Sequence, residues 1–272
     1  MTVRPFRFGV VAGYTPKVEA LTGIARRAEE LGYDTLVTPD PVAEHDPLTA
    51  LSAVAAVTSR LHFGTFVLAD AFRDRQQLNW QAQTLHKLSG GRFELGLGAG
   101  RPGAEQRAAT LGRDFGSPGQ RLRGLAETVA LVKKEQDRPK LLLAGAGPKL
   151  LELAGREADI VTLTWKPQTT EDDAKSIVDN FRSAASARLA EIELNINLIA
   201  VGDELSTEVN KFIGASTADL AAAGAVTVLP GTPGECADTL RRWRDTYGIS
   251  YITVNAAFLD KFAPVVEKLS GS

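Results

Sequence analysis

The sequence predicts an α/β fold, a TIM (β/α)8 barrel built from one domain that spans residues 1–272. Short apolar runs alternate with longer stretches of helical periodicity, and eight such runs occur within 272 residues, the usual size of this barrel. The runs cover residues 7–12, 35–39, 62–68, 93–98, 140–144, 159–164, 193–201 and 251–255. Strands that alternate with helices imply right-handed crossovers and a parallel sheet, and eight of them favour a closed barrel over an open doubly wound sheet.

The helix after the first run is predicted by periodicity, and the next by its capping residues. Apolar residues recur at steps of three and four from Val18 to Leu31, and Gly32 ends this helix. Asp46 followed by Pro47 predicts an N-cap and a first helical position.

The same capping device recurs later in the chain. Ser117 and Pro118 repeat it, and Thr232 with Glu235 adds a capping box. In the helix after Thr232, Cys236 shares one face with apolar residues at steps of three and four, which predicts a cysteine buried in the core.

Two connections are longer than the rest. Residues 100–117 follow the fourth strand and residues 202–248 separate the seventh strand from the eighth. We expect insertions after strands 4 and 7 that overhang the C-terminal end of the barrel, with a further extended piece at residues 225–229.

Composition excludes several classes of protein. The net charge of -2, from 31 basic and 33 acidic residues, provides no field for nucleic acid or for an anionic membrane. No segment approaches the roughly 20 apolar residues that a bilayer span needs. The single cysteine excludes an internal disulfide and fits a reducing compartment. We therefore expect a cytoplasmic protein with a small-molecule partner.

The first glycine cluster follows the fourth strand and contains Gly98, Ala99 and Gly100. From Gly98 onward it matches G-x-G-x-x-G, but Pro102 delays the next helix to about Pro118, whereas a dinucleotide site needs a helix that opens inside the glycine run. What remains is that a backbone without Cβ atoms lets a flat or bulky ligand approach closely.

The second glycine cluster, residues 144–149, ends the fifth strand and leads directly into a helix. Unpaired N–H groups and the positive end of the helix dipole hold phosphate at such a position. Pro148 has no N–H, so the expected donors are Gly147, Lys149 and Leu150. Two glycine clusters on neighbouring strands predict one elongated, phosphorylated ligand.

The remaining candidate groups are few. His45, His62 and His86 lie in three different elements, so no metal site is predicted; His45 is a candidate acid or base, and the other two are expected to be structural. Lys166 follows the sixth strand, where a Schiff-base lysine would sit, and Trp165 beside it is either a pocket wall or a rim contact.

Several segments, in this order and spacing, carry a resemblance to a known family. They are ARRAEELGYD (25–34), DPLTAL (46–51), TSRL (58–61), LSGGRFELGLGAG (88–100), GPKLL (147–151) and TPGECA (232–237). Together they resemble the bacterial luciferase-like monooxygenase superfamily, closest to the branch that uses the deazaflavin coenzyme F420 rather than FMN. The likeness covers nearly the whole chain and implies a barrel with the coenzyme across its C-terminal mouth, usually in a homodimer.

The resemblance also implies site residues. The family's aspartate at the end of strand two corresponds to Asp40, and its bulge behind the ring, often a non-prolyl cis peptide, corresponds to Phe66 and Val67. The strand-four contact and the phosphate-binding turn of the family correspond to Gly98, Ala99, Gly100, Ala144, Gly145, Ala146 and Gly147. Two positions depart from the family: Pro41 stands where many relatives carry histidine, and Phe66 where glycine is common.

The resemblance thus implies an oxidoreductase that moves hydride between reduced F420 and an organic substrate over its ring. Phe66, Phe72 and Trp165 are expected to line the pocket, and Asp40, His45 or Tyr14 to handle the proton. Three alternatives stay open: an FMN-dependent monooxygenase, a non-catalytic flavin-binding relative, consistent with Pro41, and a cofactor-free lyase that works through Lys166.

Overall fold

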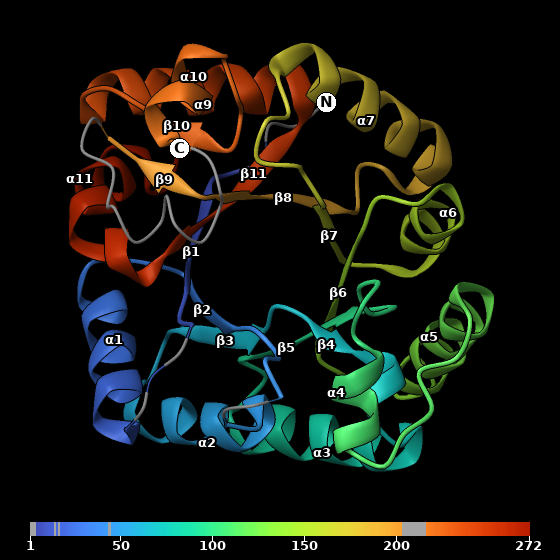
Figure 1. Cartoon of the computed structure of the whole chain (residues 1–272). Coiled ribbons are helices and arrows are strands. Elements are labelled where there is room, and N and C mark those ends of the chain that lie inside the picture. Colours follow the sequence, from blue (N-terminus) through green and yellow to red (C-terminus); the bar gives the residue numbers. More distant parts are fainter. Residues whose placement is uncertain (1–3, 14, 16, 43–44, 203–215) are drawn as a thin grey trace.

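The computed structural model describes residues 4–13, 15, 17–42, 45–202 and 216–272, and it contains the predicted closed barrel of eight parallel strands (Figure 1). Around the barrel the order is β3, β2, β1, β11, β8, β7, β6 and β5, and pairing of β3 with β5 closes the ring. The strands are β1 (Arg7–Val11), β2 (Thr35–Thr38), β3 (His62–Thr65), β5 (Phe93–Gly98), β6 (Lys140–Gly145), β7 (Ile160–Leu163), β8 (Glu193–Leu198) and β11 (Ile249–Asn255). Each overlaps one predicted run.

Helices surround the barrel as an outer ring (Figure 1). The long ones are α1 (Val18–Glu30), α2 (Pro47–Val57), α3 (Arg75–Leu88), α5 (Pro118–Val132), α6 (Pro148–Glu157), α7 (Glu171–Ala185), α10 (Pro233–Tyr247) and α11 (Leu259–Leu269). Short 3-10 turns are η1 (Asp70–Phe72), η2 (Ser186–Arg188) and η3 (Ala256–Phe258). None of the helices in the described part of the chain combines the length and apolarity that a bilayer span requires.

The capping residues act as predicted. The Asp46 carboxylate accepts the Thr49 N–H at 2.9 Å at the start of α2, and Ser117 and Thr232 form capping boxes with Gln120 and Glu235. These interactions satisfy backbone donors that would otherwise lack a partner in the first helical turn. Local sequence therefore fixes where three of the outer helices begin.

Extra elements lie in the two long connections. The short helix α4 (Glu105–Thr110) follows β5, and β9 (Ala200–Val201), α9 (Thr217–Ala222) and β10 (Val228–Leu229) lie between β8 and α10. β10 pairs with β9 in a small parallel sheet, which accounts for the extended piece predicted at residues 225–229. A short strand β4 (Leu68–Ala69) also continues the line of β3 and pairs with β5.

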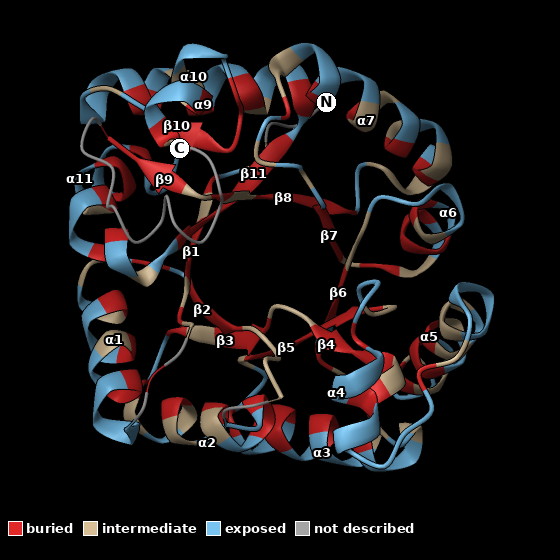
Figure 2. Cartoon of the chain, viewed as in Figure 1, coloured by how far each residue is buried: buried red, intermediate tan, exposed pale blue. Residues whose placement is uncertain are grey.

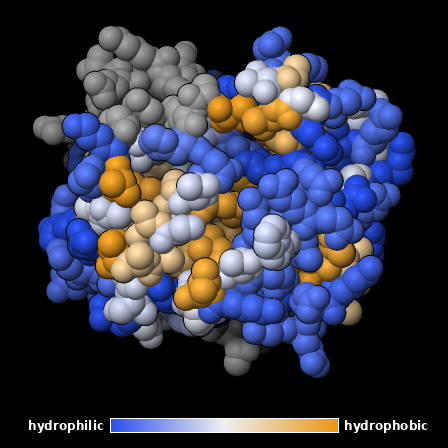
Figure 3. All heavy atoms as spheres, turned by 90° about the horizontal axis from the view of Figure 1, so that it is seen from below, coloured by the Kyte–Doolittle hydropathy of each residue, from blue (hydrophilic) through white to orange (hydrophobic). Residues whose placement is uncertain are grey.

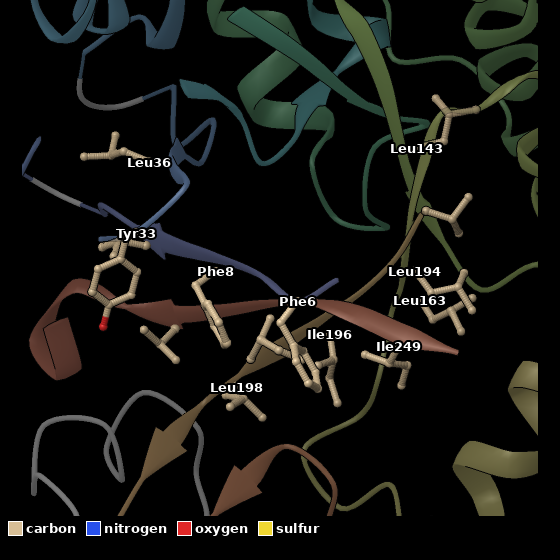
Figure 4. Close-up of a cluster of buried hydrophobic side chains, with 14 of the residues drawn as sticks. Phe6, Phe8, Tyr33, Leu36, Leu143, Leu163, Leu194, Ile196, Leu198 and Ile249 are labelled. Carbon is tan, nitrogen blue, oxygen red and sulfur yellow. The ribbon is translucent and has the colours of Figure 1, made fainter. Parts of the chain in front are cut away.

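Alternate strand residues serve two different cores. One set packs against the helices in the main hydrophobic cluster, which Figure 4 shows around Phe8, Leu36, Ile196 and Leu198. The other set points into the barrel, where Leu142, Ile160 and Tyr251 form a separate cluster. Figure 2 shows the strands almost wholly buried. Cys236 is buried in the main cluster, as predicted.

A buried ionic cluster fills the N-terminal end of the barrel. Arg7 forms ion pairs with Glu94 and, at 2.9 Å, with Glu193. Burial alone raises the pKa of Glu94, but the charge of Arg7 and a hydrogen bond from His62 outweigh it, and the pKa of Glu94 is lowered. These side chains occupy the barrel interior at its N-terminal end. The other end of the barrel, where the strands terminate, is called the mouth.

Candidate functional site

The two glycine turns lie side by side at the mouth. β5 and β6 are adjacent parallel strands with Leu97 opposite Leu143, so both strands end at the same rim. A Cβ built on Gly98 would lie 3.5 Å from the carbonyl oxygen of Ala144. The two turns thus form one continuous edge of backbone with almost no side chain on it.

The strand break behind this edge is held by Thr65 and Gly96. The Thr65 hydroxyl donates to the Gly96 carbonyl at 2.8 Å and accepts the Gly96 N–H at 2.9 Å. A Cβ on Gly96 would lie 1.9 Å from the Thr65 carbonyl oxygen, so only glycine allows this approach. The next peptide bond, Phe66–Val67, is cis, as the resemblance implies.

The second turn leaves the N-terminus of α6 open. Gly147 is the N-cap and has no side-chain cap, and a Cβ placed on it would meet no atom within 4 Å. The Leu150 N–H bonds the Gly147 carbonyl at 2.9 Å, so the expectation that Leu150 is a free donor is wrong. Within the described chain, the N–H groups of Gly147 and Lys149 make no hydrogen bond. Two donors therefore face outward at a helix end of positive potential.

The first turn is supported from behind by α5. Gly100 has φ +84, and a Cβ there would lie 2.8 Å from the Phe115 ring. Arg121 stacks on Phe115 and donates to the carbonyl oxygens of Ala99 at 3.0 Å and Gly116 at 2.7 Å. Sequence reasoning missed Phe115 and Arg121, which lie in a loop and a helix without a recognisable motif.

Asp40 is engaged in a buried ion pair. Its carboxylate accepts two N–H groups of Arg73, at 2.5 and 2.9 Å, and the backbone N–H of Ala69 at 3.1 Å. Its side chain is only 4% exposed. Although burial lowers the pKa of Arg73, its hydrogen bond to Asp40 and the charge of Asp40 raise it overall. All three interactions use Asp40 as an acceptor, so its geometry suits a structural tie between β2 and β4.

The other two candidate proton carriers are His45 and Tyr14. His45 is exposed after β2, and its Nε2 lies 3.0 Å from the Thr15 carbonyl oxygen. Tyr14 lies outside the described residues. The structure therefore offers His45 as an accessible titratable group at this end of the barrel.

The three predicted pocket aromatics are dispersed. Phe66 is half-buried and packs with Val67 and Ala144 against the inner cluster. Phe72, 5% exposed, packs against Phe115 in a small cluster under α4 and has little surface left for a ligand. Trp165 packs against the main cluster, and its buried indole N–H has no partner in the described chain. Of the three, Phe66 alone belongs to the inner cluster.

Hydrogen-bonding side chains line the opposite wall of the barrel. Thr162 donates to the Asn195 side-chain oxygen at 3.0 Å, and the Asn195 amide donates to the Tyr251 carbonyl at 3.2 Å. One layer nearer the mouth, Thr253 donates to the Asn197 side-chain oxygen at 3.1 Å. The sequence contains a signal for these residues, because asparagine alternates with apolar residues in ELNINL (193–198). The alternation shows that the asparagines share one face of the strand, but it does not show whether that face points into the barrel.

The remaining candidate features are Lys166, two polar cavities, and the histidines His62 and His86. Lys166 is exposed, so it lacks the buried, apolar surroundings in which a Schiff-base lysine works. A polar cavity of about 430 Å³ beside the rim is walled by arginines, including Arg75 and Arg113, and one of about 350 Å³ lies at the N-terminal end around Lys140. His62 and His86 contact Glu94 and Asp137, consistent with structural roles.

Comparison with known sequences places this site in a family. The sequence pattern of the family described as luciferase-like monooxygenase matches residues 1–135. Residues 1–135 belong to the luciferase-like monooxygenase family. The matched part contains β1 to β5, the cis peptide and the first glycine turn.

Curated relatives include an F420-dependent enzyme and a reductase. An F420-dependent glucose-6-phosphate dehydrogenase from Amycolatopsis mediterranei is 31% identical over 172 residues, 51% of this chain and 51% of that protein. A 5,10-methylenetetrahydromethanopterin reductase from Methanolobus tindarius is 26% identical over 201 residues, 65% of this chain and 60% of that protein. The chain thus spans about half the length of the curated relatives it matches.

Solved structures share the fold over almost the whole chain. The F420-dependent tetrahydromethanopterin reductase from Methanopyrus kandleri aligns with a TM-score of 0.73, 15% identity, and 98% of this chain with 99% of that one. An F420-dependent secondary alcohol dehydrogenase gives 0.76 at 16% identity, covering 98% of each chain, and the EDTA monooxygenase of Chelativorans sp. BNC1 gives 0.76 at 14%, covering 97% and 94%. At these identities the likeness establishes the fold, a barrel of parallel strands surrounded by helices.

Proposed function

We propose that this protein is an oxidoreductase that binds coenzyme F420 across the mouth and moves hydride between it and an organic substrate. The observation that carries the proposal is the continuous backbone edge formed by the turns after β5 and β6. It offers a flat wall for a ring at Gly98 and a helix end for an anion at Gly147 within one rim. F420-dependent curated relatives add support.

The residues present fit such a coenzyme. A Cβ on Gly147 would meet nothing within 4 Å, so a phosphate has room beside the free N–H groups of Gly147 and Lys149. In the proposal, Gly145 and Ala146 complete this cradle, while Gly98, Ala99, Gly100 and Ala144 border the ring and Phe66 and Val67 back it. When bound, the coenzyme supplies or accepts the hydride.

In the proposal, the chain's own residues hold the site in place and supply the proton that accompanies the hydride. Asp40 and Arg73 tie the end of β2 to β4 and so hold the backbone beside the cis peptide in place. Because Asp40 is committed to Arg73, the proposal assigns the accompanying proton to His45, with Tyr14 remaining a prediction. Phe66 would help to exclude water from the reacting atoms.

The competing coenzyme is FMN, since the matched family is described as luciferase-like monooxygenase. Titrating the purified protein with F420 and FMN separately, by fluorescence and equilibrium dialysis, distinguishes the two. We expect F420 to bind at micromolar concentration or tighter and FMN more weakly. Tighter binding of FMN would favour a monooxygenase, and failure of both to bind would reject the proposed function.

We also propose that the protein pairs with a second copy of itself through α2 and α3. Trp80 is 73% exposed and Leu88 80% exposed on α3, and α2 carries no charged residue. Figure 3, seen from the α2 and α3 side, shows apolar side chains gathered on this face. Because α2 has no charged side chain, it can meet the α2 of a second copy without like-charge repulsion, which favours a symmetric homodimer.

The oligomeric state tests this pairing. Sedimentation of the wild type should give a dimer, and Trp80→Glu should give a folded monomer because it places two charges at the contact. Leu111→Glu is the matched control, since Leu111 is exposed at the end of α4 and belongs to neither α2 nor α3, so the change should leave the dimer intact. A monomeric wild type, or a Trp80→Glu dimer, would reject the pairing.

A further inference from the structure

The inner wall of the mouth has two chemically different halves. At the mouth ends of β5 and β6 the inward positions are glycine and alanine, namely Gly98 and Ala144. On β7, β8 and β11 the same alternation places threonine and asparagine inward, namely Thr164, Asn197, Thr253 and Asn255. The first half is flat, and the second offers neutral hydrogen-bonding groups.

The Asn197 side chain has an oxygen with a hydrogen-bond partner and an NH2 group without one among the described residues. Its side-chain oxygen lies 3.1 Å from the Thr253 hydroxyl, which shares its proton with the Ile196 carbonyl oxygen at 3.2 Å. Its NH2 group has no partner in the described part of the chain, and the residue is half-buried. One layer deeper, Asn195 is fully buried and bonded through both its oxygen and its nitrogen. A half-buried donor that lacks an acceptor favours a ligand oxygen there.

The charges of the barrel interior lie elsewhere. Arg7, Glu94 and Glu193 sit at the opposite end, beyond the fully buried Tyr251. At the mouth, Asp40 and Arg73 neutralise each other. Among the described inward positions of the mouth named above there is no ionisable side chain. A charged substrate buried against these positions would lose water without gaining an opposite charge from them, which is unfavourable.

We propose that the substrate is an uncharged alcohol or carbonyl compound and that the Asn197 amide donates a hydrogen bond to its oxygen. This inference rests on the proposed function, which supplies the coenzyme. In the reducing direction, the bound reduced coenzyme would supply a hydride to the carbonyl carbon and be oxidised, the C=O π pair would move to oxygen, and that oxygen would take the proton that the proposed function assigns to His45. Asn197 stabilises the negative charge that develops on the oxygen.

The experiment compares matched substrates and matched variants. Wild type is assayed with F420 on propan-2-ol against lactate and on glucose against glucose 6-phosphate. Asn197→Asp keeps the acceptor for Thr253 and removes the donor. Asn180→Asp on the outside of α7 makes the same chemical change at an exposed residue and serves as control. The F420 dissociation constant is measured for all three proteins.

We expect the neutral member of each pair to be preferred. Asn197→Asp should lower kcat/KM on it about 10- to 100-fold with the F420 dissociation constant unchanged within about twofold. Unchanged F420 binding also shows that the variant is folded. Preference for the anionic members, or wild-type kcat/KM in Asn197→Asp, would overturn the inference while leaving F420 binding, and so the proposed function, intact.

A structural readout is independent of turnover. In crystals soaked with propan-2-ol, its oxygen should lie within hydrogen-bond distance of the Asn197 NH2 group, and a lactate soak should leave that position without a carboxylate. A carboxylate bound at Asn197 would contradict the proposed neutral substrate class. A wild type that binds no F420 in the titration would instead reject the proposed function.

Discussion

Asp40 shows how a residue singled out as a proton carrier can have a different part in the structure. Its carboxylate is buried and accepts three N–H groups, two of them from Arg73. The family resemblance marked Asp40, but its partner Arg73 lies 33 positions away in a loop with no motif. Pairings of this kind depend on the folded chain and leave no local signal.

The Asp40 and Arg73 pair gives a stability prediction. Arg73→Met should destabilise the fold by about 3 kcal/mol, because it leaves a carboxylate that is 4% exposed without its partner. Adding Asp40→Asn to Arg73→Met should recover at least about 1 kcal/mol of that loss. Urea unfolding of the wild type, Arg73→Met, Asp40→Asn and the double variant measures the coupling free energy between the two residues. Strictly additive effects would show that the two residues do not act as a pair.

Glu29 gives a prediction about pH. One of its carboxylate oxygens accepts the backbone N–H groups of Ser59, Arg60 and Leu61 at 2.9, 2.6 and 2.8 Å. Burial raises the pKa of Glu29, but these bonds outweigh it and the pKa is lowered from its ordinary value of 4.5. A lowered pKa stabilises the fold above the unfolded-state value, and this contribution is lost as the pH falls through the folded-state pKa.

The stability advantage of the wild type over Glu29→Gln should therefore be constant from about pH 8 to pH 6 and shrink below about pH 4.5. Denaturant unfolding of both proteins across this range provides the measurement. A difference that grows on acidification would contradict the assigned role.

At the level of elements, the strands were predicted well and their interruptions were not. The apolar runs at 62–68 and 193–201 each correspond to two strands, β3 with β4 and β8 with β9. An apolar run reports burial, which continues through a bend, so it cannot show where pairing moves to another partner. The break after β3 rests on contacts between Thr65 and Gly96 that are 31 residues apart.

Gly96 tests that break. Gly96→Ala should destabilise the protein by about 3 kcal/mol or more, because the added Cβ would lie 1.9 Å from a backbone oxygen. Gly23→Ala in α1 is the matched control: it meets no atom within 4 Å in a helix interior and should stabilise by up to about 1 kcal/mol. Thermal unfolding compares them. Equal stabilities for the two variants would show that close approach at Gly96 is unnecessary.

At the level of the whole molecule, alternation of strands and helices was sufficient to predict the barrel and the shared rim of the two glycine turns. Neighbouring parallel strands end at the same edge, so the turns that contain Gly98 and Gly147 were expected at one rim. The side chains behind the rim were less accessible to this reasoning. Phe72 and Trp165 pack in clusters outside the barrel. The strand pattern could not predict this, because it does not show on which side of the barrel wall the side chain of a loop residue packs.

The central claim is that one ligand spans the mouth, with its anionic group at the start of α6. A crystal structure of the protein with F420 tests it most directly. We predict the coenzyme phosphate within hydrogen-bond distance of the Gly147 and Lys149 N–H groups and its ring beside Gly98. A coenzyme found instead in the arginine-walled cavity around Arg75 and Arg113, with the start of α6 uncontacted, would contradict the account.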